Sequence, residues 1–286
     1  MMPKFDGAQA LRTVATTGCN ALVAVPTMIE MMIHASAVKQ VMTLPMVRTV
    51  LVGGQSMSQS LVHRARQLLP HAVFIQTFAC TEASSSITFS VISTPDQPIT
   101  DAHKAREGRT QSGELVTCLP VGRPGHHCEV AIFDDSAKSP MMVPRGTIGR
   151  IATAGAHVMM GYVNLPRETG EAVVGGWLFT GDVGFLDRDG TLCFTSRSTD
   201  RINTGGEKVF AREVEEALLQ HAAVEHAAVF GVDHGTLGQA VVAAVVLRAG
   251  RKEVGEDDLR AHCKRLLSGY KVGISRSRMF GQSLRV

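Results

Sequence analysis

Short apolar runs and helically spaced apolar residues alternate along the first third of the chain. The runs, which are rich in β-branched side chains, predict buried β-strands over residues 21–25, 47–52 and 72–75. Helical spacing predicts helices over residues 8–15, 28–33 and 59–69. Pro26 is expected to stop the first strand, and Thr27 and Ser58 to cap the second and third helices. This strand–helix–strand order predicts an α/β fold with a parallel sheet.

Polar residues follow two of these strands. Gly53, Gly54 and Gln55 come after the second strand, and residues 76–82 come after the third. Ligands of parallel sheets bind beyond the carboxyl ends of the strands. The Thr81 hydroxyl and the Glu82 carboxylate could therefore meet a phosphate and its magnesium ion, which prefers oxygen ligands. The alternative, which these two residues alone favour, is that Thr81 merely caps a helix of small residues.

The middle of the chain contains fewer candidate binding or catalytic residues. Residues 93–112 are predicted to be a surface excursion, and residues 129–133 a strand. His126 and His127 are neighbours on an extended segment and point to opposite faces, so we interpret them as structural rather than as metal ligands.

Residues 175–209 hold the most distinctive pattern. An apolar run at the only tryptophan, Trp177, leads to Gly181 and Asp182, which predicts a strand that ends in a tight turn with a carboxylate at its tip. Residues 187–190 (DRDG) predict a β-hairpin turn. The second strand of this hairpin leads to Arg197, and an Asp with an Arg can hold a diol or a phosphate. The alternative is a surface hairpin with a solvated, charged end.

The last third changes in character. Helices are predicted over residues 213–221 and 256–267, and strands over residues 224–232 and 239–247. This pattern predicts a small α+β domain at 199–286, after a first domain at 1–198. The polar joint between them is Ser198, Thr199 and Asp200.

Composition narrows the class of protein. A length of 286 residues predicts about two domains, and a net charge of +3 gives no indication of a nucleic-acid partner. Six scattered cysteines without a C-x-x-C pair indicate a reducing compartment. There is no strong membrane signal, because no apolar run is long enough to span a bilayer. A secretory signal peptide contains an uninterrupted apolar segment, and the N-terminus has none, so an intracellular location is expected.

Several segments together resemble the adenylate-forming acyl-CoA ligase superfamily. They are GGQ at 53–55, FACTE at 78–82, GAHVMMGY at 155–162, GWLFTGD at 176–182, SRSTDRI at 196–202 and GGEKVFAREVE at 205–215. Four residues depart from the family patterns: Phe78 replaces Tyr, Ala79 and Ser196 replace Gly, and Ala211 replaces Pro. Residues 83–89 and 122–124 look most like the plant-type 2-succinylbenzoate–CoA ligases.

The resemblance implies a fold and a reaction. The fold would be the C-terminal part of the adenylate-forming N-domain, a parallel sheet plus a small β-rich lobe, followed by a mobile, truncated C-terminal domain. The reaction would convert a small-molecule carboxylate and ATP to an acyl-adenylate, then to a thioester of coenzyme A. The implied location is the cytoplasm by default, with a chloroplast or peroxisome as the alternative for a full-length relative.

The resemblance also implies roles for residues. Thr81 and Glu82 would be catalytic, with Thr81 on the α-phosphate and Glu82 on Mg²⁺. Coenzyme A would pass Gly205 and Gly206, and the hinge would be Ser198, Thr199 and Asp200. The implied ATP/AMP ligands are Gly53, Gly54, Gln55, Phe78, Thr81, Asp182 and Arg197.

Two family features do not occur in the sequence. The glycine-rich phosphate loop of the type STG-x-TG-x-PK precedes the region that resembles this chain, and Gln282 stands near the expected C-terminal lysine. Lys271 belongs to the preceding YK-x-P motif, so we do not assign it that role. We therefore expect a truncated ligase form with weak or no activity; the alternative is a catalytically dead nucleotide- or partner-binding fragment.

Overall fold

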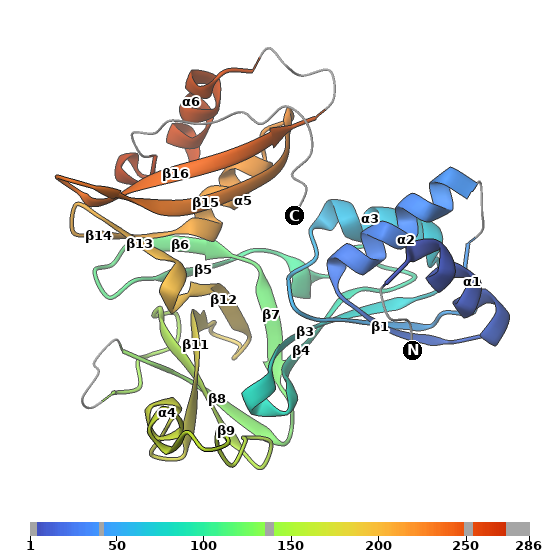
Figure 1. Cartoon of the computed structure of the whole chain (residues 1–286), viewed down its shortest axis with the longest axis horizontal. Coiled ribbons are helices and arrows are strands. Elements are labelled where there is room, and N and C mark those ends of the chain that lie inside the picture. The colour runs from blue at the N-terminus through green and yellow to red at the C-terminus, as the bar shows by residue number, and fades with distance from the viewer. Residues whose placement is uncertain (1–4, 40–42, 135–139, 249–253, 273–286) are drawn as a thin grey trace. The chain divides into compact units, whose positions relative to one another are not determined.

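The structure is a computed structural model that describes residues 5–39, 43–134, 140–248 and 254–272. The chain divides into two compact units (Figure 1). The first unit comprises Met1–Thr180 and Gly184–Phe194, and the second comprises Gly181–Val183 and Thr195–Val286. No helix among the described residues is long and apolar enough to cross a membrane.

The first unit begins with the predicted α/β pattern. Strands β1 (Ala21–Ala24), β2 (Thr49–Val52) and β3 (Val73–Cys80) are parallel neighbours. The helices are α1 (Gly7–Thr17), α2 (Pro26–Lys39) and α3 (Gln59–Leu68). Because crossovers between parallel strands are right-handed and the strand order runs in one direction, α2 and α3 cover the same face of the sheet. The parallel arrangement and the Ser58 cap, which accepts 3.2 Å from the Leu61 amide, confirm the prediction.

Two details at the start of the chain differ from the prediction. Helix α2 begins at Pro26 rather than after a Thr27 cap, because the fixed φ of proline suits the first turn and no amide is needed there. Strand β1 is not buried: the Val23 side chain is 81% exposed. A continuous apolar run does not show that one face of a strand is left uncovered.

Strand β3 is longer than the apolar run that predicted it. It continues from Val73 to Cys80 and pairs antiparallel with β4 (Ser85–Ser93). Residues 76–80 therefore lie within the sheet, and the prediction that the strand ends at Ile75 is wrong. The added pairing with β4 is a tertiary contact that local apolar spacing cannot reveal, and it makes the sheet mixed.

The remaining strands extend this sheet to ten, in the order β1-β2-β3-β4-β7-β12-β11-β9-β8 with β10 beside β11. They form the β-rich lobe, together with the short helix α4 (Pro166–Ala172). The predicted strand at 129–133 and the hairpin turn at 187–190 are confirmed, and Asp187 Oδ1 accepts the amides of Asp189 and Thr191 at 2.9 Å. The strands are β7 (Pro120–Pro124), β8 (Cys128–Phe133), β9 (Gly149–Gly155), β10 (Val173–Val174), β11 (Trp177–Leu186) and β12 (Leu192–Arg197).

Residues 93–112 are more ordered than a surface excursion. They contain a 3₁₀ turn, η2 (Asp101–His103), and the strand β5 (Arg106–Arg109), which pairs with β6 (Leu115–Cys118). The His103 side chain is fully buried, and this burial lowers its pKa. The charged residues around it concealed this inward-facing side chain from sequence reasoning.

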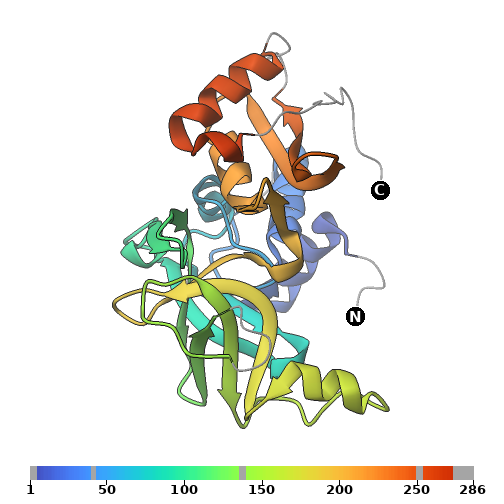
Figure 2. The same ribbon diagram turned by 90° about the vertical axis from the view of Figure 1, so that its left-hand side faces the viewer.

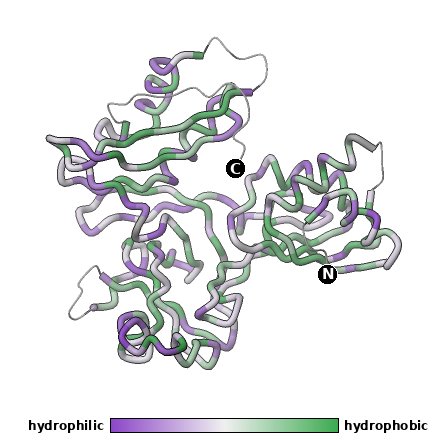
Figure 3. Tube along the Cα trace, viewed as in Figure 1, coloured by the Kyte–Doolittle hydropathy of each residue, from purple (hydrophilic) through white to green (hydrophobic). Residues whose placement is uncertain are grey.

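The second unit is the predicted α+β module. Its sheet has the order β14-β13-β16-β15, and Figure 3 shows hydrophobic residues along β15 and β16. Helices α5 and α6 contribute Val214, Leu218 and Leu259 to its apolar core. The elements are 3₁₀ turn η3 (Ser198–Asp200), β13 (Arg201–Thr204), β14 (Glu207–Phe210), α5 (Ala211–Leu219), β15 (Val224–His234), β16 (Gly238–Leu247), α6 (Glu256–Leu266) and η4 (Gly269–Lys271).

One buried ion pair ties the end of the second unit to α5. The Lys271 Nζ lies 2.8 and 2.9 Å from the two carboxylate oxygens of Glu213, and the lysine side chain is only 2% exposed. This pair gives Lys271 a structural partner. Gln282 and the expected lysine position lie outside the described residues.

Candidate active site

A glycine turn follows β2 at the edge of the sheet where ligands were predicted. Gly54 has φ +80°, a conformation that glycine adopts without strain. The buried Gln76 of β3 holds the segment that follows: its Nε2 donates to Ser56 Oγ and its Oε1 accepts from the Met57 amide, both at 3.1 Å. Gln55 is exposed. Sequence reasoning assigned no role to Gln76, although it fixes this loop.

Thr81 and Glu82 lie on a turn between β3 and β4, and two residues with strained backbone follow them. The turn is a single 3₁₀ segment, η1 (Thr81–Ala83), and Cys80 rather than Thr81 occupies the capping position. The alternative in which Thr81 caps a helix is therefore wrong, because the chain returns directly into β4. Ser84 and Ser85 have φ values of 55° and 136°. Non-glycine residues with such φ values store strain and are concentrated at functional sites.

Glu82 is held by a second segment of the same unit. The Tyr162 hydroxyl donates to Glu82 Oε1 at 2.9 Å, and the Met159 amide donates to the Glu82 carbonyl at 2.8 Å. Thr169 of α4 in turn accepts the Tyr162 amide at 2.9 Å. The hydrogen bond to the carboxylate raises the pKa of Tyr162. Sequence reasoning recognised the GY element but gave Tyr162 no role.

Phe78 lies largely within the core of the first unit. Its side chain is 9% exposed, and its ring centroid is 6.1 Å from that of Phe194 at an interplanar angle of 35°. It belongs to an apolar cluster with Ala83 and Ile87. Most of the ring is therefore used in packing, and its contact with adenine stays a prediction.

Asp182 and Arg197 lie close together in the second unit. The sequence analysis expected these two side chains to hold a diol or a phosphate. Arg197 Nε lies 3.4 Å from Asp182 Oδ1; the arginine side chain is 65% exposed and the aspartate 4%. Gly181 and Asp182 lie in the middle of β11 and not at a strand end, so that prediction is wrong. The reason is that the strand continues through Gly181: its φ of +76° is a local irregularity that glycine allows within a strand.

Gly205 and Gly206 form the two-residue turn between β13 and β14. Thr204 pairs with Glu207, and the two glycines have φ values of 59° and 89°. A two-residue turn with both φ values positive matches the twist of an antiparallel hairpin and favours glycine. The requirement for both glycines is thus explained by the turn itself, and the passage of coenzyme A stays a prediction.

The histidines of the β-rich lobe form a local contact. The rings of His127 and His157 meet edge to face at 5.5 Å, and His157 Nε2 lies 2.9 Å from Thr153 Oγ1. Burial, followed by the neighbouring His127, lowers the pKa of His157. Across the described ranges, no cluster of three or more His, Cys, Asp or Glu side chains is arranged for a metal ion.

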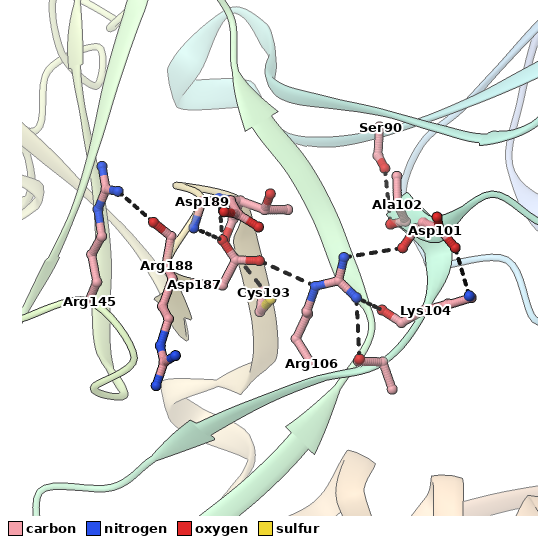
Figure 4. Close-up of polar contacts among 12 residues, drawn as sticks. Ser90, Asp101, Ala102, Lys104, Arg106, Arg145, Asp187, Arg188, Asp189 and Cys193 are labelled. Atoms are coloured by element: carbon pink, nitrogen blue, oxygen red, sulfur yellow. Dashed lines mark hydrogen bonds and ion pairs between the residues drawn. The ribbon is translucent and has the colours of Figure 1, made fainter.

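A cavity of about 570 Å³ beside the β5–β6 hairpin is rich in arginine but serves the fold. Arg106 Nε lies 3.3 Å from Asp187 Oδ2, and its Nη2 donates to the Asp101 carbonyl at 3.1 Å (Figure 4). Arg145 donates to the carbonyl of Arg188 at 2.8 Å. These contacts secure the hairpin turn at 187–190, so we assign this cavity no catalytic role.

The chain belongs to the AMP-binding enzyme family. The family profile matches residues 1–163, and the profile of the family's C-terminal domain matches residues 213–275. The chain is 32% identical over 291 residues to the chloroplastic/peroxisomal 2-succinylbenzoate–CoA ligase of Arabidopsis thaliana. The aligned region covers 95% of this chain and 50% of the relative. The fold and the acyl-CoA ligase resemblance are thereby confirmed.

Solved structures agree. An o-succinylbenzoate coenzyme A synthetase from Bacillus subtilis, in complex with ATP and magnesium, has a TM-score of 0.71 and 28% identity, with 94% of this chain and 50% of that chain covered. The amide bond synthetase McbA from Marinactinospora thermotolerans has a TM-score of 0.79 and 30% identity, with 100% and 52% covered. The chain spans about half the length of the relatives that it matches.

Proposed function

We propose that this chain supplies part of the adenylate-binding machinery of an ATP-dependent acyl-CoA ligase for an aromatic acid similar to 2-succinylbenzoate. The main support is the turn that carries Thr81 and Glu82: its Glu82 carboxylate accepts the Tyr162 hydroxyl at 2.9 Å, and the strained residues Ser84 and Ser85 follow it. The Arabidopsis and Bacillus relatives supply the substrate class through their names.

The reaction has two steps. An oxygen of the substrate carboxylate attacks the α-phosphorus of ATP, and pyrophosphate leaves with the electrons of the broken bond. The thiol of coenzyme A then loses its proton and attacks the acyl carbonyl, and AMP leaves. Binding by residues that stabilise charge developing at the phosphate is the largest catalytic contribution in such reactions.

The residues present fit these ligands. A carboxylate such as Glu82 has about four acceptor sites on two oxygens, so the bond from Tyr162 leaves capacity for Mg²⁺. Magnesium, when bound, neutralises phosphate charge and prefers oxygen ligands. We assign the α-phosphate to Thr81, the ribose to Asp182 and Arg197, and the remaining nucleotide contacts to Gly53, Gly54, Gln55 and Phe78.

The proposed hinge and the proposed path of coenzyme A lie C-terminal to these residues. Gly205 and Gly206 would border the path of coenzyme A. Ser198, Thr199 and Asp200 would be the hinge between domains at 1–198 and 199–286. The 3₁₀ turn η3 joins β12 to β13 at these three residues, and hinges are short segments that absorb large backbone changes.

A second candidate is a catalytically silent nucleotide-binding protein. The glycine-rich phosphate loop does not occur in the 286 residues, and Gln282 carries no positive charge. Loss of one donor to a developing charge typically costs about 10²–10³ in rate. The chain alone is therefore expected to be weakly active or inactive even if the ligase assignment is right.

Two assays on the full chain separate these candidates. Pyrophosphate release with ATP and 2-succinylbenzoate should be small. Calorimetry should show that AMP binds no worse than ATP, because the proposed nucleotide contacts are with adenine, ribose and the α-phosphate, all of which AMP retains. Robust turnover would refute the expectation of weak activity. No AMP binding at millimolar concentration, on folded protein, would refute the nucleotide-binding role itself.

A further inference from the structure

One buried hydroxyl group of the second unit has no partner in the fold. Ser196 on β12 is only 4% exposed, and its Oγ has no hydrogen-bond partner among the described residues. Buried hydroxyl groups without a partner cost free energy and are rare in folded proteins. Ser196 replaces the glycine of the family pattern, so the fold of the family does not depend on a side chain here. The presence of this hydroxyl therefore needs a reason other than folding.

The neighbouring hydroxyl on the same strand does serve the fold. Thr195 Oγ1 donates to the carbonyl oxygen of Val183 on β11 at 2.8 Å, and Thr195 is also buried. Successive side chains of a strand point to opposite faces, so the Ser196 side chain points away from this contact. Two adjacent residues with buried hydroxyls thus differ, because one hydroxyl is bonded within the protein and the other is not.

Ser196 lies across the β11–β12 hairpin from Asp182. The two strands are neighbours in the sheet and lie side by side in both views (Figures 1 and 2). The Asp187 amide donates to the Thr191 carbonyl at 2.9 Å, and counting along both strands from this pair places Ser196 opposite Asp182. The irregularity at Gly181 lies beyond Asp182 in this count. Directly opposite residues share a face, with their Cβ atoms about 4.5–5.5 Å apart.

The chemistry around Asp182 suits the two adjacent hydroxyls of a ribose. Asp182, Ser196 and Arg197 all belong to the second unit. Arg197 Nε lies 3.4 Å from Asp182 Oδ1, but the arginine side chain is largely exposed. Exposed ion pairs contribute little to stability, so this side chain can turn aside for a ligand at little cost. An ionised carboxylate only accepts hydrogen bonds, whereas a serine hydroxyl both donates and accepts, so the pair can bond two neighbouring hydroxyls.

We propose that Ser196 is a further nucleotide ligand, whose hydroxyl forms a hydrogen bond with a ribose hydroxyl beside Asp182. This inference rests on the proposed nucleotide-binding function and adds a contact that the glycine of the family pattern cannot make. The hydroxyl then has opposite effects in the two states of the protein. It is buried and without a partner before the nucleotide binds, and it is bonded afterwards.

Two variants of the full chain separate this role from a role in folding. Ser196→Ala should bind AMP roughly two- to tenfold more weakly in calorimetry, the equivalent of one neutral hydrogen bond. It should also melt at a higher temperature than the unaltered chain, because a buried hydroxyl without a partner has been removed. Thr195→Val is the matched control, since its hydroxyl is bonded to Val183. This control should bind AMP like the unaltered chain and melt at a lower temperature.

Deoxy analogues of AMP identify the part of the ligand that Ser196 contacts. With either 2′-deoxy-AMP or 3′-deoxy-AMP, Ser196→Ala should bind as tightly as the unaltered chain, because the ligand hydroxyl that Ser196 contacts is then missing. An equal loss of affinity for AMP and for both analogues would overturn the assignment to the ribose. A lower melting temperature of Ser196→Ala would overturn it too, because the hydroxyl would then serve the fold.

The failure of this inference can be told apart from the failure of the proposed function. If the unaltered chain binds AMP and Ser196→Ala binds it equally well, Ser196 is not a ligand, and the nucleotide-binding function stands. If the folded, unaltered chain does not bind AMP at millimolar concentration, the nucleotide-binding function is refuted, and this inference with it.

Discussion

Tyr162 and Glu82 are 80 residues apart in the sequence, yet the tyrosine hydroxyl donates to the glutamate carboxylate at 2.9 Å. The Tyr162 backbone is itself anchored by Thr169 of α4, at 2.9 Å. A carboxylate that accepts one hydrogen bond keeps further acceptor capacity on its two oxygens. We therefore interpret Tyr162 as a positioning residue for Glu82. Changing either residue should alter the Tyr162 pKa or ligand binding, and both can be measured on folded protein.

The pKa of Tyr162 should fall toward its usual value in Glu82→Gln. The ionised Glu82 accepts a hydrogen bond from the neutral phenol and so raises the folded-state pKa above the unfolded value of about 10. The contribution to stability is therefore complete below about pH 10 and is lost as pH rises through the folded pKa. Ultraviolet titration of tyrosinate in a Tyr270→Phe background checks this. Glu168→Gln, an exposed change on α4, is the control, and an unchanged Tyr162 pKa in Glu82→Gln would contradict the prediction.

Tyr162→Phe should weaken magnesium-dependent ATP binding by roughly two- to tenfold, the equivalent of one neutral hydrogen bond of about 0.5–1.5 kcal/mol. AMP binding without magnesium should be unchanged, because the lost hydroxyl orients only Glu82. Calorimetric titrations with and without Mg²⁺ separate the two effects, with Tyr270→Phe as the control. An equal loss of magnesium-free AMP binding would point instead to general damage of the fold.

Asp182→Ala should weaken AMP binding by roughly tenfold or more. Hydrogen bonds to a charged group contribute about 1.5–3 kcal/mol, and about 1.4 kcal/mol corresponds to tenfold in affinity. Isothermal calorimetry with AMP measures the change. Asp189→Ala is a suitable control, because Asp189 is an exposed residue of the 187–190 turn. Equal affinities of the two variants would remove Asp182 from the ribose site.

Lys271→Met should lower the free energy of unfolding by about 3 kcal/mol, since removing one partner leaves the Glu213 carboxylate part-buried and without its ion pair. Urea unfolding measures this loss. Lys264→Met, an exposed lysine on α6, should change stability little. Combining Lys271→Met with Glu213→Leu should recover part of the loss. A Lys271→Met variant as stable as Lys264→Met would show that the pair contributes nothing.

Limited proteolysis of the full chain should cut first near residues 198–200. This follows from the proposed hinge, because segments that absorb backbone changes open more readily than core strands. Mass spectrometry of the fragments identifies the site. Cleavage confined to the first unit would count against the hinge.

The sequence correctly predicted the caps and turns that are held by contacts between residues close together in the chain. Ser58 caps α3 because its own side chain reaches the Leu61 amide, and the 187–190 turn forms because Asp187 accepts two nearby amides. The family motifs selected Thr81, Glu82, Asp182 and Arg197 by residue type, and their roles stay predictions.

Features set by distant contacts were missed. The extension of β3 depends on β4, and the contact of Tyr162 with Glu82 depends on how a later loop returns to the sheet. Gly181 followed by Asp182 has the same local signal in a turn as in a bent strand, so only the structure could place it within β11. The apolar run at 21–25 gave no sign that the Val23 side chain is exposed.

The division of the chain between its units has a consequence for its synthesis. The polypeptide passes from one unit to the other three times, after Thr180, after Val183 and after Phe194. The first unit is incomplete until Phe194 has emerged from the ribosome, by which time residues 181–183 of the second unit have already been made. A fragment that begins at residue 199 would lack residues 181–183 and 195–198 of the second unit.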